Sequence, residues 1–322
     1  KLEDIIGRTE LLKQTDGTSV RHGKMNLDKL IYKVKSKSTP YCSTKNNEPF
    51  DDAQLSKQIL KDAIPYIKSK KIKTLSYEIK NYNRSVGASL SGEIAKLYGN
   101  YGLKNTPITI RLNGTAGQSL GAWNADGLHI RLIGDANDYV GKGMAGGEIS
   151  ISAPEKLADN AEKMVIIGNT CLYGATGGQL FANGLAGERF AVRNSGCTSV
   201  VEGTGHHACE YMTGGTIVVL GETGSNFGAG MTGGLAFIYD KEKKFDKNAN
   251  TQSIDYNALN KKSLNKHKIY LKSLLEKHFK VTKSVKCKRI LDNFDTETKY
   301  FIVVKPISSS FDELLSQITS AA

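Results

Sequence analysis

The sequence lacks the features that would make it a disulfide-rich, metal-binding or membrane protein. Its five cysteines are scattered, odd in number and free of any C-x-x-C pair, so neither a disulfide framework nor an iron–sulfur site is indicated. No apolar run is long enough to span a bilayer, and the first residues show no signal-peptide pattern. No Walker-A sequence is present either. These absences predict a chain that works in a reducing compartment, without membrane contact.

Charge is unevenly distributed along the 322 residues. Residues 108–240 carry 7 Lys/Arg and 12 Asp/Glu, whereas the flanks carry 37 and 20, so the net charge of +12 comes from the flanks. The flanking lysines are mixed with Asn, Ser and acidic residues, whereas a nucleic-acid binder concentrates its charge on a recognition element. The lysines therefore predict solvated surfaces and no nucleic-acid partner.

Glycine is concentrated in the central segment, where a double glycine recurs. Of the 33 glycines, 26 lie between Pro107 and Asp240. Four copies of the double glycine precede an alternating apolar run, in the phrases GMAGGEISI, GATGGQLFA, YMTGGTIVV and GMTGGLAFI. Their spacings of 31, 37 and 19 residues fit a repeat of about 20 residues, as in a solenoid. The longer gaps are expected to hold extra strands at 164–167, 188–192 and 198–203.

This repeat predicts a mainly β chain that coils as a parallel β-helix. Glycine at each corner would supply the positive φ of a sharp bend at little steric cost. A leucine-rich horseshoe would need helical or Leu/Asn-patterned returns, which the sequence lacks. Because side chains alternate along a strand, two aligned positions of the repeat should form inward ladders. The first ladder contains Ile149, Leu180, Ile217 and Ala236, and the second contains Ile151, Ala182, Val219 and Ile238.

Composition divides the chain into four parts. We expect an N-terminal arm or linker at 1–52, a helix–strand–helix lead-in at 53–107, the Gly-rich β-helix at 108–240, and a C-terminal helical cap and tail at 241–322. The flanking helices would cap the open ends of the solenoid. Pro65 is expected to kink or end the first helix. Periodicity predicts helices at 54–68, 85–98, 263–279, 285–294 and 312–318, and strands at 73–79 and 300–305.

Two stretches match the dinucleotide-binding pattern G-x-G-x-x-G, at Gly141–Gly146 and Gly228–Gly233. In a Rossmann unit these glycines turn from a strand into a helix whose N-terminus holds a pyrophosphate. Each stretch here leads into an alternating strand pattern instead, and both occupy repeat positions. We therefore interpret them as solenoid corners and not as a nucleotide site.

A histidine- and cysteine-containing stretch is the other candidate site. Zinc needs about four converging ligands, whereas adjacent histidines on a strand point to opposite faces. Glu210 would raise the pKa of Cys209, which argues against a nucleophilic thiol. We expect packing or hydrogen-bonding roles for this group, which contains His206, His207 and Cys209, with Cys197 and Glu202 nearby.

The carboxylates of the repeats show no pairing pattern. Polysaccharide-cleaving enzymes use two carboxylates that flank the scissile bond, and these acids do not share one repeat position. We predict no catalytic, cofactor-binding or metal-binding residue on this chain. The acids are expected to cap turns or lie on the surface: Asp126, Asp135, Asp138, Glu148, Glu188, Glu202, Glu210 and Glu222.

Three long phrases resemble the C-terminal domain of the glutamate synthase large (alpha) subunit. They are Gly99–Gly147, Ile166–Gly196 and Val200–Asp240, within a dense match over Tyr77–Asp240. A weaker match includes the stretches IIGRTELL and FIVVKP near the two ends. The resemblance implies a right-handed, single-stranded parallel β-helix with flanking helices. It also implies an enzyme that makes two glutamates from glutamine, 2-oxoglutarate and a reductant.

The resemblance assigns this domain a scaffold role without chemistry of its own. The family's amidotransferase domain uses an N-terminal cysteine, whereas this chain begins with Lys1, so we expect a processed piece, a fragment or one domain of something larger. FMN and a 3Fe-4S cluster belong to the family's synthase domain, and no cofactor is expected here. The implied partners are the amidotransferase and FMN-binding domains, with ferredoxin or a small reductase subunit. The implied location is the cytoplasm, with a plastid or other organelle as an alternative.

Two other functions remain open from the sequence. The chain could be a separate β-helix subunit of another redox or amidotransferase complex, of the kind found in formylmethanofuran dehydrogenase. It could also be a nucleotide- or phosphate-binding enzyme that uses the Gly-rich corners.

Overall fold

The computed structural model describes the chain as two compact units, Lys1–Asp52 and Ala53–Ala322, apart from residues 1, 16–25, 34, 36–51, 100–101 and 321–322. The first unit contains two short 3-10 helices, η1 (Leu2–Ile5) and η2 (Thr9–Leu11). Most of the arm and linker predicted before residue 52 lies outside the described residues. No helix in the described part of the chain is long and apolar enough to cross a membrane.

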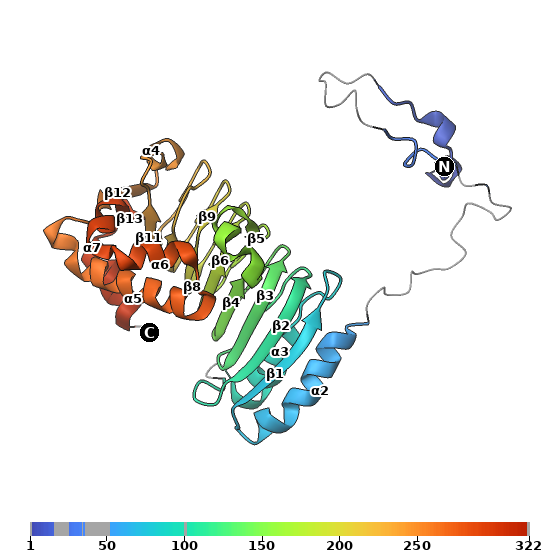
Figure 1. The fold of residues 1–322 in the computed structure, drawn as a ribbon, viewed down its shortest axis with the longest axis horizontal. Helices are drawn as coiled ribbons and strands as arrows, with labels where there is room; N and C mark the ends of the chain where they lie inside the picture. Colours follow the sequence, from blue (N-terminus) through green and yellow to red (C-terminus); the bar gives the residue numbers. More distant parts are fainter. Residues whose placement is uncertain (1, 16–25, 34, 36–51, 100–101, 321–322) are drawn as a thin grey trace. The chain divides into compact units, whose positions relative to one another are not determined.

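The second unit is a β-solenoid of about seven turns with flanking helices, which confirms the predicted fold class. Its main sheet stacks one strand from each coil in parallel, side by side in Figure 1. A smaller strip of β5 (Val165–Ile167), β7 (Leu185–Ala186) and β9 (Gly203–Thr204) forms a second parallel stack. The main parallel strands are β1 (Lys73–Ile79), β2 (Ile108–Ala116), β3 (Leu128–Ala136), β4 (Glu148–Ser152), β6 (Gln179–Asn183), β8 (Ser195–Val201), β10 (Thr213–Val219) and β11 (Gly233–Tyr239).

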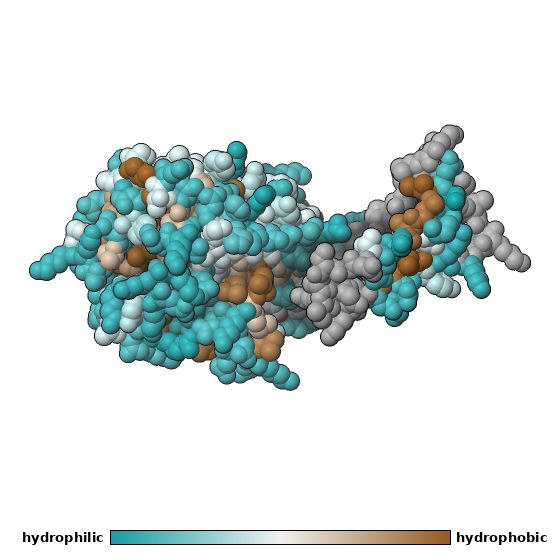
Figure 2. All heavy atoms as spheres, turned by 90° about the horizontal axis from the view of Figure 1, so that it is seen from above, coloured by the Kyte–Doolittle hydropathy of each residue, from teal (hydrophilic) through white to brown (hydrophobic). Residues whose placement is uncertain are grey.

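The two predicted inward ladders form the core of the solenoid. Ile149 pairs with Leu180, and Ile151 with Ala182, across β4 and β6. The same two columns continue through β10 and β11 and are fully buried. Figure 2 shows hydrophilic side chains over most of the visible surface of the Ala53–Ala322 unit, with separate small hydrophobic patches. The repeat alignment therefore identified the interior of the fold correctly.

The N-terminal end of the solenoid is closed by two helices, α2 (Gln54–Lys68) and α3 (Ala88–Tyr98). Helix α2, predicted at 54–68, buries Ile59, Ala63 and Ile67 against the interior core, at the spacing of one helix face. Pro65 lies in its last turn, and the helix ends three residues later. Strand β1 pairs in parallel with β2, so the sheet begins before residue 108.

The C-terminal end is closed by antiparallel strands. Strand β13 (Phe301–Pro306) pairs antiparallel with β11 and with β12 (Ile254–Ala258), which ends the parallel stack. The predicted helices correspond to α5 (Asn265–Thr282), α6 (Val285–Asp292) and α8 (Phe311–Ser320). The remaining short elements are η4 (Glu155–Lys163), α4 (Phe245–Asn248), η5 (Lys262–Leu264), α7 (Phe294–Glu297) and η6 (Thr298–Tyr300).

These C-terminal helices cover the outer face of the later coils, in front of β6 and β8 in Figure 1. The outward side chains there are apolar and fully buried, as at Phe181, Val218 and Phe237. They form a second hydrophobic core with Leu271 and Leu275 of α5. The sheet therefore has apolar layers on both faces over its C-terminal half.

One strand was predicted wrongly. Residues 188–192 form a turn, and the strand of that coil is β8. Arg189, Ala191 and Arg193 have φ values of 58°, 58° and 56°, which a strand does not contain. The buried side chains of Phe190 and Val192 fill the corner of the solenoid. Apolar, β-favouring residues at a corner gave the same signal as a strand.

Candidate functional site

The two G-x-G-x-x-G stretches build corners of the solenoid, as predicted. Gly141 and Gly143 have φ values of 64° and 62°, and each stretch leads through a turn into a strand, β4 or β11. Other coils place ordinary residues in the same left-handed backbone conformation. Positive φ therefore recurs at every second residue of a corner: at Ser119, Gly121 and Trp123; at Thr170, Leu172 and Gly174; and at His207, Cys209 and Tyr211.

Glycine is required at a corner where an aromatic ring of the preceding coil lies against the backbone. A Cβ added to Gly143 would lie 2.8 Å from the Trp123 ring, and one added to Gly230 would lie 2.7 Å from the Tyr211 ring. Both rings are more than half exposed. These glycines thus make room for side chains, and neither stretch opens a helix that could bind a pyrophosphate.

The histidine pair lies in a turn, where the sequence predicted a strand. The rings of His206 and His207 lie edge to face, with centroids 6.3 Å apart, and each ring has a different hydrogen-bonding partner. His206 Nδ1 accepts a hydrogen bond from the Ser225 backbone N–H (2.8 Å), and His207 Nδ1 lies 2.7 Å from Glu210 Oε1. His207 has a φ of 64°, a left-handed conformation for which its residue type carries no signal in the sequence.

The nearby thiols and Glu202 lie in other environments. Cys197 and Cys209 face the solenoid interior, whereas Glu202 lies beneath the C-terminal helices. Among the described residues, no three His, Cys, Asp or Glu side chains group so that they could hold a metal ion. Burial raises the pKa of the Cys209 thiol, so the predicted direction is right but burial, and not Glu210, is the cause.

Four thiols are expected to resist labelling in the native protein. Burial raises the pKa of Cys171 to about 12 and raises those of the other three, so little reactive thiolate forms. Titration with a thiol-reactive disulfide at mildly alkaline pH should leave Cys171, Cys197, Cys209 and Cys287 unmodified, and all five cysteines should react after unfolding. Rapid native labelling of Cys209, located by peptide mass spectrometry, would contradict the described packing.

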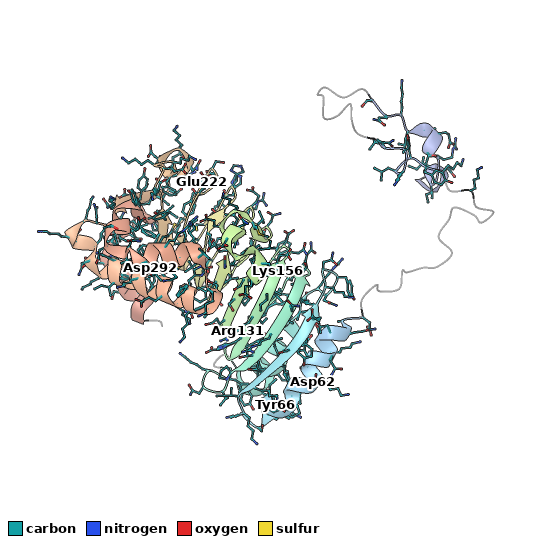
Figure 3. The ribbon with its side chains drawn as sticks, in the orientation of Figure 1. Asp62, Tyr66, Arg131, Lys156, Glu222 and Asp292 are labelled. Carbon is teal, nitrogen blue, oxygen red and sulfur yellow. The ribbon has the colours of Figure 1, made fainter. Side chains whose placement is uncertain are left out.

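The acids of the repeats are each engaged separately. The Asp138 carboxylate accepts a hydrogen bond from the Asn169 backbone N–H (2.7 Å), and that of Asp135 accepts one from the Thr115 hydroxyl (2.7 Å). Glu222, labelled in Figure 3, forms an ion pair with Lys244 at 2.6 Å. None of these contacts joins two carboxylates across a gap, as glycoside hydrolysis would require.

A polar cluster lies sealed between the solenoid and helices α5 and α6. The Ser284 hydroxyl donates a hydrogen bond to Glu202 Oε1, and His278 Nε2 lies 3.8 Å from the same oxygen. All three side chains are at most 1% exposed. Serine, histidine and glutamate are the residues of a hydrolase triad, but here the carboxylate accepts its hydrogen bond from the serine, and all three side chains are buried. The cluster connects the cap to the solenoid.

A small pocket lies where the last coil meets the cap. Its volume is about 200 Å³, and charged side chains line it, including Asp240, Glu242 and Lys286. Burial lowers the pKa of Lys286, and the carboxylates of Glu162 and Glu202 act in the opposite direction. Lys244 forms ion pairs with Glu222 and Glu242 at the pocket, so charges within the chain already neutralise each other there.

The outer face of β1, β2 and β3 differs from the rest of the sheet, because the C-terminal helices do not cover it (Figure 1). We call this surface the open face. Arg111 and Arg131 are in register on adjacent strands and are both exposed. Ile133, the next outward residue after Arg131, is 53% exposed. The outward residues of the open face are Thr74, Ser76, Glu78, Thr109, Arg111, Asn113, His129, Arg131 and Ile133.

The open face ends at β4, where helix α5 begins to cover the sheet. Lys277 of α5 forms an ion pair with Glu148 of β4 at 3.1 Å. Burial lowers the pKa of the neighbouring His129, while Glu148 raises it. Figure 3 shows Arg131 on the sheet, next to the end of helix α5. Sequence reasoning missed the open face, although the alternating phrases ITIRLNG and LHIRLIG contrast with the continuous apolar runs of β10 and β11.

Comparison with known proteins is consistent with this architecture. A family model described as GXGXG motif matches residues 52–307. The chain belongs to the GXGXG motif family. The spacing in that description is the spacing at which left-handed residues recur in each corner. The match covers the solenoid with helices α2, α3, α5 and α6, and it ends before α8.

The GXGXG chain is also similar to glutamate synthases, which confirms the resemblance identified in the sequence. It is 46% identical over 319 residues to the ferredoxin-dependent glutamate synthase of Pyropia yezoensis, covering 97% of the chain and 20% of the relative. It is 39% identical over 319 residues to the glutamate synthase [NADPH] large chain of Bacillus subtilis, covering 98% and 20%. For the glutamate synthase [NADH] of Schizosaccharomyces pombe the values are 38% over 317 residues, 95% and 14%. The chain therefore spans about a fifth or less of the length of these relatives.

Proposed function

We propose that this chain is a non-catalytic scaffold domain of a glutamate synthase, which makes two glutamates from glutamine, 2-oxoglutarate and a reductant. In this proposal the solenoid supports the amidotransferase and FMN-binding domains and keeps them in register. Two observations together carry the proposal. The chain matches only about a fifth of the length of glutamate synthases, and its polar side chains are engaged in structural contacts. The histidines, acids and thiols described above are hydrogen-bonded, ion-paired or buried in contacts within the chain.

The cofactors of the proposed enzyme belong to its synthase domain. A cubane-type cluster needs cysteine thiolates that converge on it. Here the thiol of Cys171 lies 3.3 Å from the Gly168 carbonyl, and that of Cys287 lies 3.2 Å from the Leu275 carbonyl, on different elements. These buried thiols do not fit a cluster, so the scaffold role assigns FMN and the 3Fe-4S group to other domains.

The reductant and the location follow from the same proposal. Relatives carry names that specify ferredoxin, NADH or NADPH, and one is described as chloroplastic/mitochondrial. We infer that electrons reach the synthase domain from ferredoxin or from a small reductase subunit, and that the enzyme works in the cytoplasm or a plastid. In this proposal the chain supports the synthase domain and carries no redox group.

An activity comparison tests the scaffold role. The purified 322-residue chain should neither hydrolyse glutamine nor form glutamate from 2-oxoglutarate in the presence of a reductant. The native protein that contains the chain should do both. Glutamine hydrolysis by the isolated chain, lost on substitution of one of its own side chains, would contradict a non-catalytic role.

A further inference from the structure

We propose that the open face docks an acidic protein surface, carried by a neighbouring domain of the same enzyme, through Arg111 and Arg131. This inference rests on the proposed function, because it identifies which surface of the scaffold holds a partner. Four observations carry it: the register of the two arginines, their lack of carboxylate partners, the exposed Ile133 beside Arg131, and the covered half of the same sheet.

The two arginines place like charges side by side on the open face. They are directly opposite on parallel strands, which lie about 4.8 Å apart. Like charges in such positions are destabilising. Within the described part of the chain, neither guanidinium is within ion-pair distance of a carboxylate. Glu78, the acid of the open face, accepts hydrogen bonds from the Asn113 side chain at 3.0 and 3.2 Å.

The chemistry of the open face favours a protein carboxylate over a small anion. Phosphate sites are usually concave and use free backbone N–H groups. The backbone of β2 and β3 is instead committed to the parallel ladder, and the surface is the outer face of a sheet. Guanidinium groups bind carboxylates through two parallel hydrogen bonds, and arginine is enriched at protein interfaces. Ile133 supplies the aliphatic contact next to Arg131.

The covered half of the sheet shows which charges a covering segment places against the outer face. At the margin of the cover, the sheet supplies the acid, Glu148, and helix α5 supplies the base, Lys277. One coil earlier, the sheet supplies Arg131 and, in register, Arg111. A cover that continued over β3 and β2 would therefore need acidic residues. The chemistry expected of the partner is an acidic surface with an apolar patch, lying beside α5.

Arginine-selective labelling tests the docking directly. The native protein, with every polypeptide segment attached to it, is treated with phenylglyoxal and compared with the 322-residue chain alone. Arg111 and Arg131 should react about tenfold more slowly in the native protein, because a charged hydrogen bond contributes about that factor. The exposed corner residues Arg189 and Arg193 are matched controls and should react equally in both samples.

A charge-reversal pair separates docking from folding. In the native protein, R111E/R131E should increase the proteolytic release of this chain, whereas R189E/R193E should not. Both double variants change the charge equally at exposed positions. In the isolated chain, both should retain the parental melting temperature. A loss of stability confined to R111E/R131E in the isolated chain would mean that the arginines act in folding, and would overturn the docking role.

The outcomes distinguish this inference from the proposed function. Equal reactivity of Arg111 and Arg131 in both samples overturns the docking surface, even where a larger polypeptide with bound cofactors supports the scaffold role. A native product consisting of this chain alone overturns both. Protection of the two arginines by inorganic polyphosphate, without protection in the native protein, would replace the protein partner with a small anion and contradict the proposal.

Discussion

Replacing Gly134 with alanine is expected to lower the free energy of unfolding of the solenoid by about 3 kcal/mol or more. Gly134 lies in β3 with φ of 142°, a conformation that alanine rarely adopts. An added Cβ would lie 1.8 Å from the carbonyl oxygen of Gly114 in the neighbouring coil. Relief would require the two coils to separate, which breaks the parallel ladder on which the stack depends. Denaturant unfolding followed by circular dichroism measures the change.

Two matched substitutions separate the clash from other effects of alanine. Gly174 has φ of 63° with open space around its Cβ position, so Gly174→Ala should cost only about 1–2 kcal/mol of backbone strain. Gly92 lies in α3, also with open space, so Gly92→Ala should be neutral or stabilising by up to about 1 kcal/mol. An equal loss of stability in Gly134→Ala and Gly174→Ala would show that close contact between coils is not the cause.

Replacing Phe237 with alanine is expected to cost about 3–5 kcal/mol and to loosen the C-terminal cap. Phe237 points outward from β11, is fully buried and lies 6.3 Å from the Tyr270 ring of α5. Its removal leaves a cavity between the sheet and the helices that cover it. Hydrogen exchange should therefore increase first in α5 and α8, while the interior ladders remain protected.

Ile133→Ala is the matched control for this substitution. Ile133 also points outward from the sheet, but it lies on the open face and is 53% exposed. Its truncation should change the stability of the isolated chain by no more than about 0.5 kcal/mol. A loss similar to that of Phe237→Ala would show that the outer face of β3 is covered within this chain, and would contradict the description of an open face.

The interior of the solenoid could be predicted from the sequence because one physical rule repeats in every coil. The double glycine marks the start of four strands, β4, β6, β10 and β11, and strict alternation then sends Ile149 and Ile151, with their counterparts, to the same side. The register observed between β4 and β6 is the alignment of the repeats themselves. The flanking helices were predictable for a similar reason, since an apolar stripe at helical spacing has one buried face.

The corners could not be read in the same way. Positive φ at Arg189 and His207 depends on hydrogen bonds to the next coil, such as Arg189 N–H to the His206 carbonyl (2.8 Å). Such residues give no sequence signal of positive φ, because glycine is the residue type from which a left-handed conformation is usually predicted. This explains both the false strand at 188–192 and the assumption that the two histidines lie on a strand.

The packing on the outer face of the sheet could not be predicted, because it depends on contacts between segments far apart in the sequence. The buried Glu202 is bound by Ser284, 82 residues later in the chain, and repeat spacing gives no information about that contact. The open face required knowing where the C-terminal helices end on the sheet, which is set by tertiary packing of α5 against β4, β6 and β8. The contrast between the alternating strands β2 and β3 and the continuously apolar strands β10 and β11 is the trace that this arrangement leaves in the sequence.

The most direct test of the scaffold account is the intact mass of the native polypeptide that contains this chain, together with the visible absorption spectrum of the same preparation. The account predicts a single polypeptide several times larger than 35.0 kDa, with absorbance from flavin and iron–sulfur groups. A colourless native product of 35.0 kDa, active or not, would contradict it.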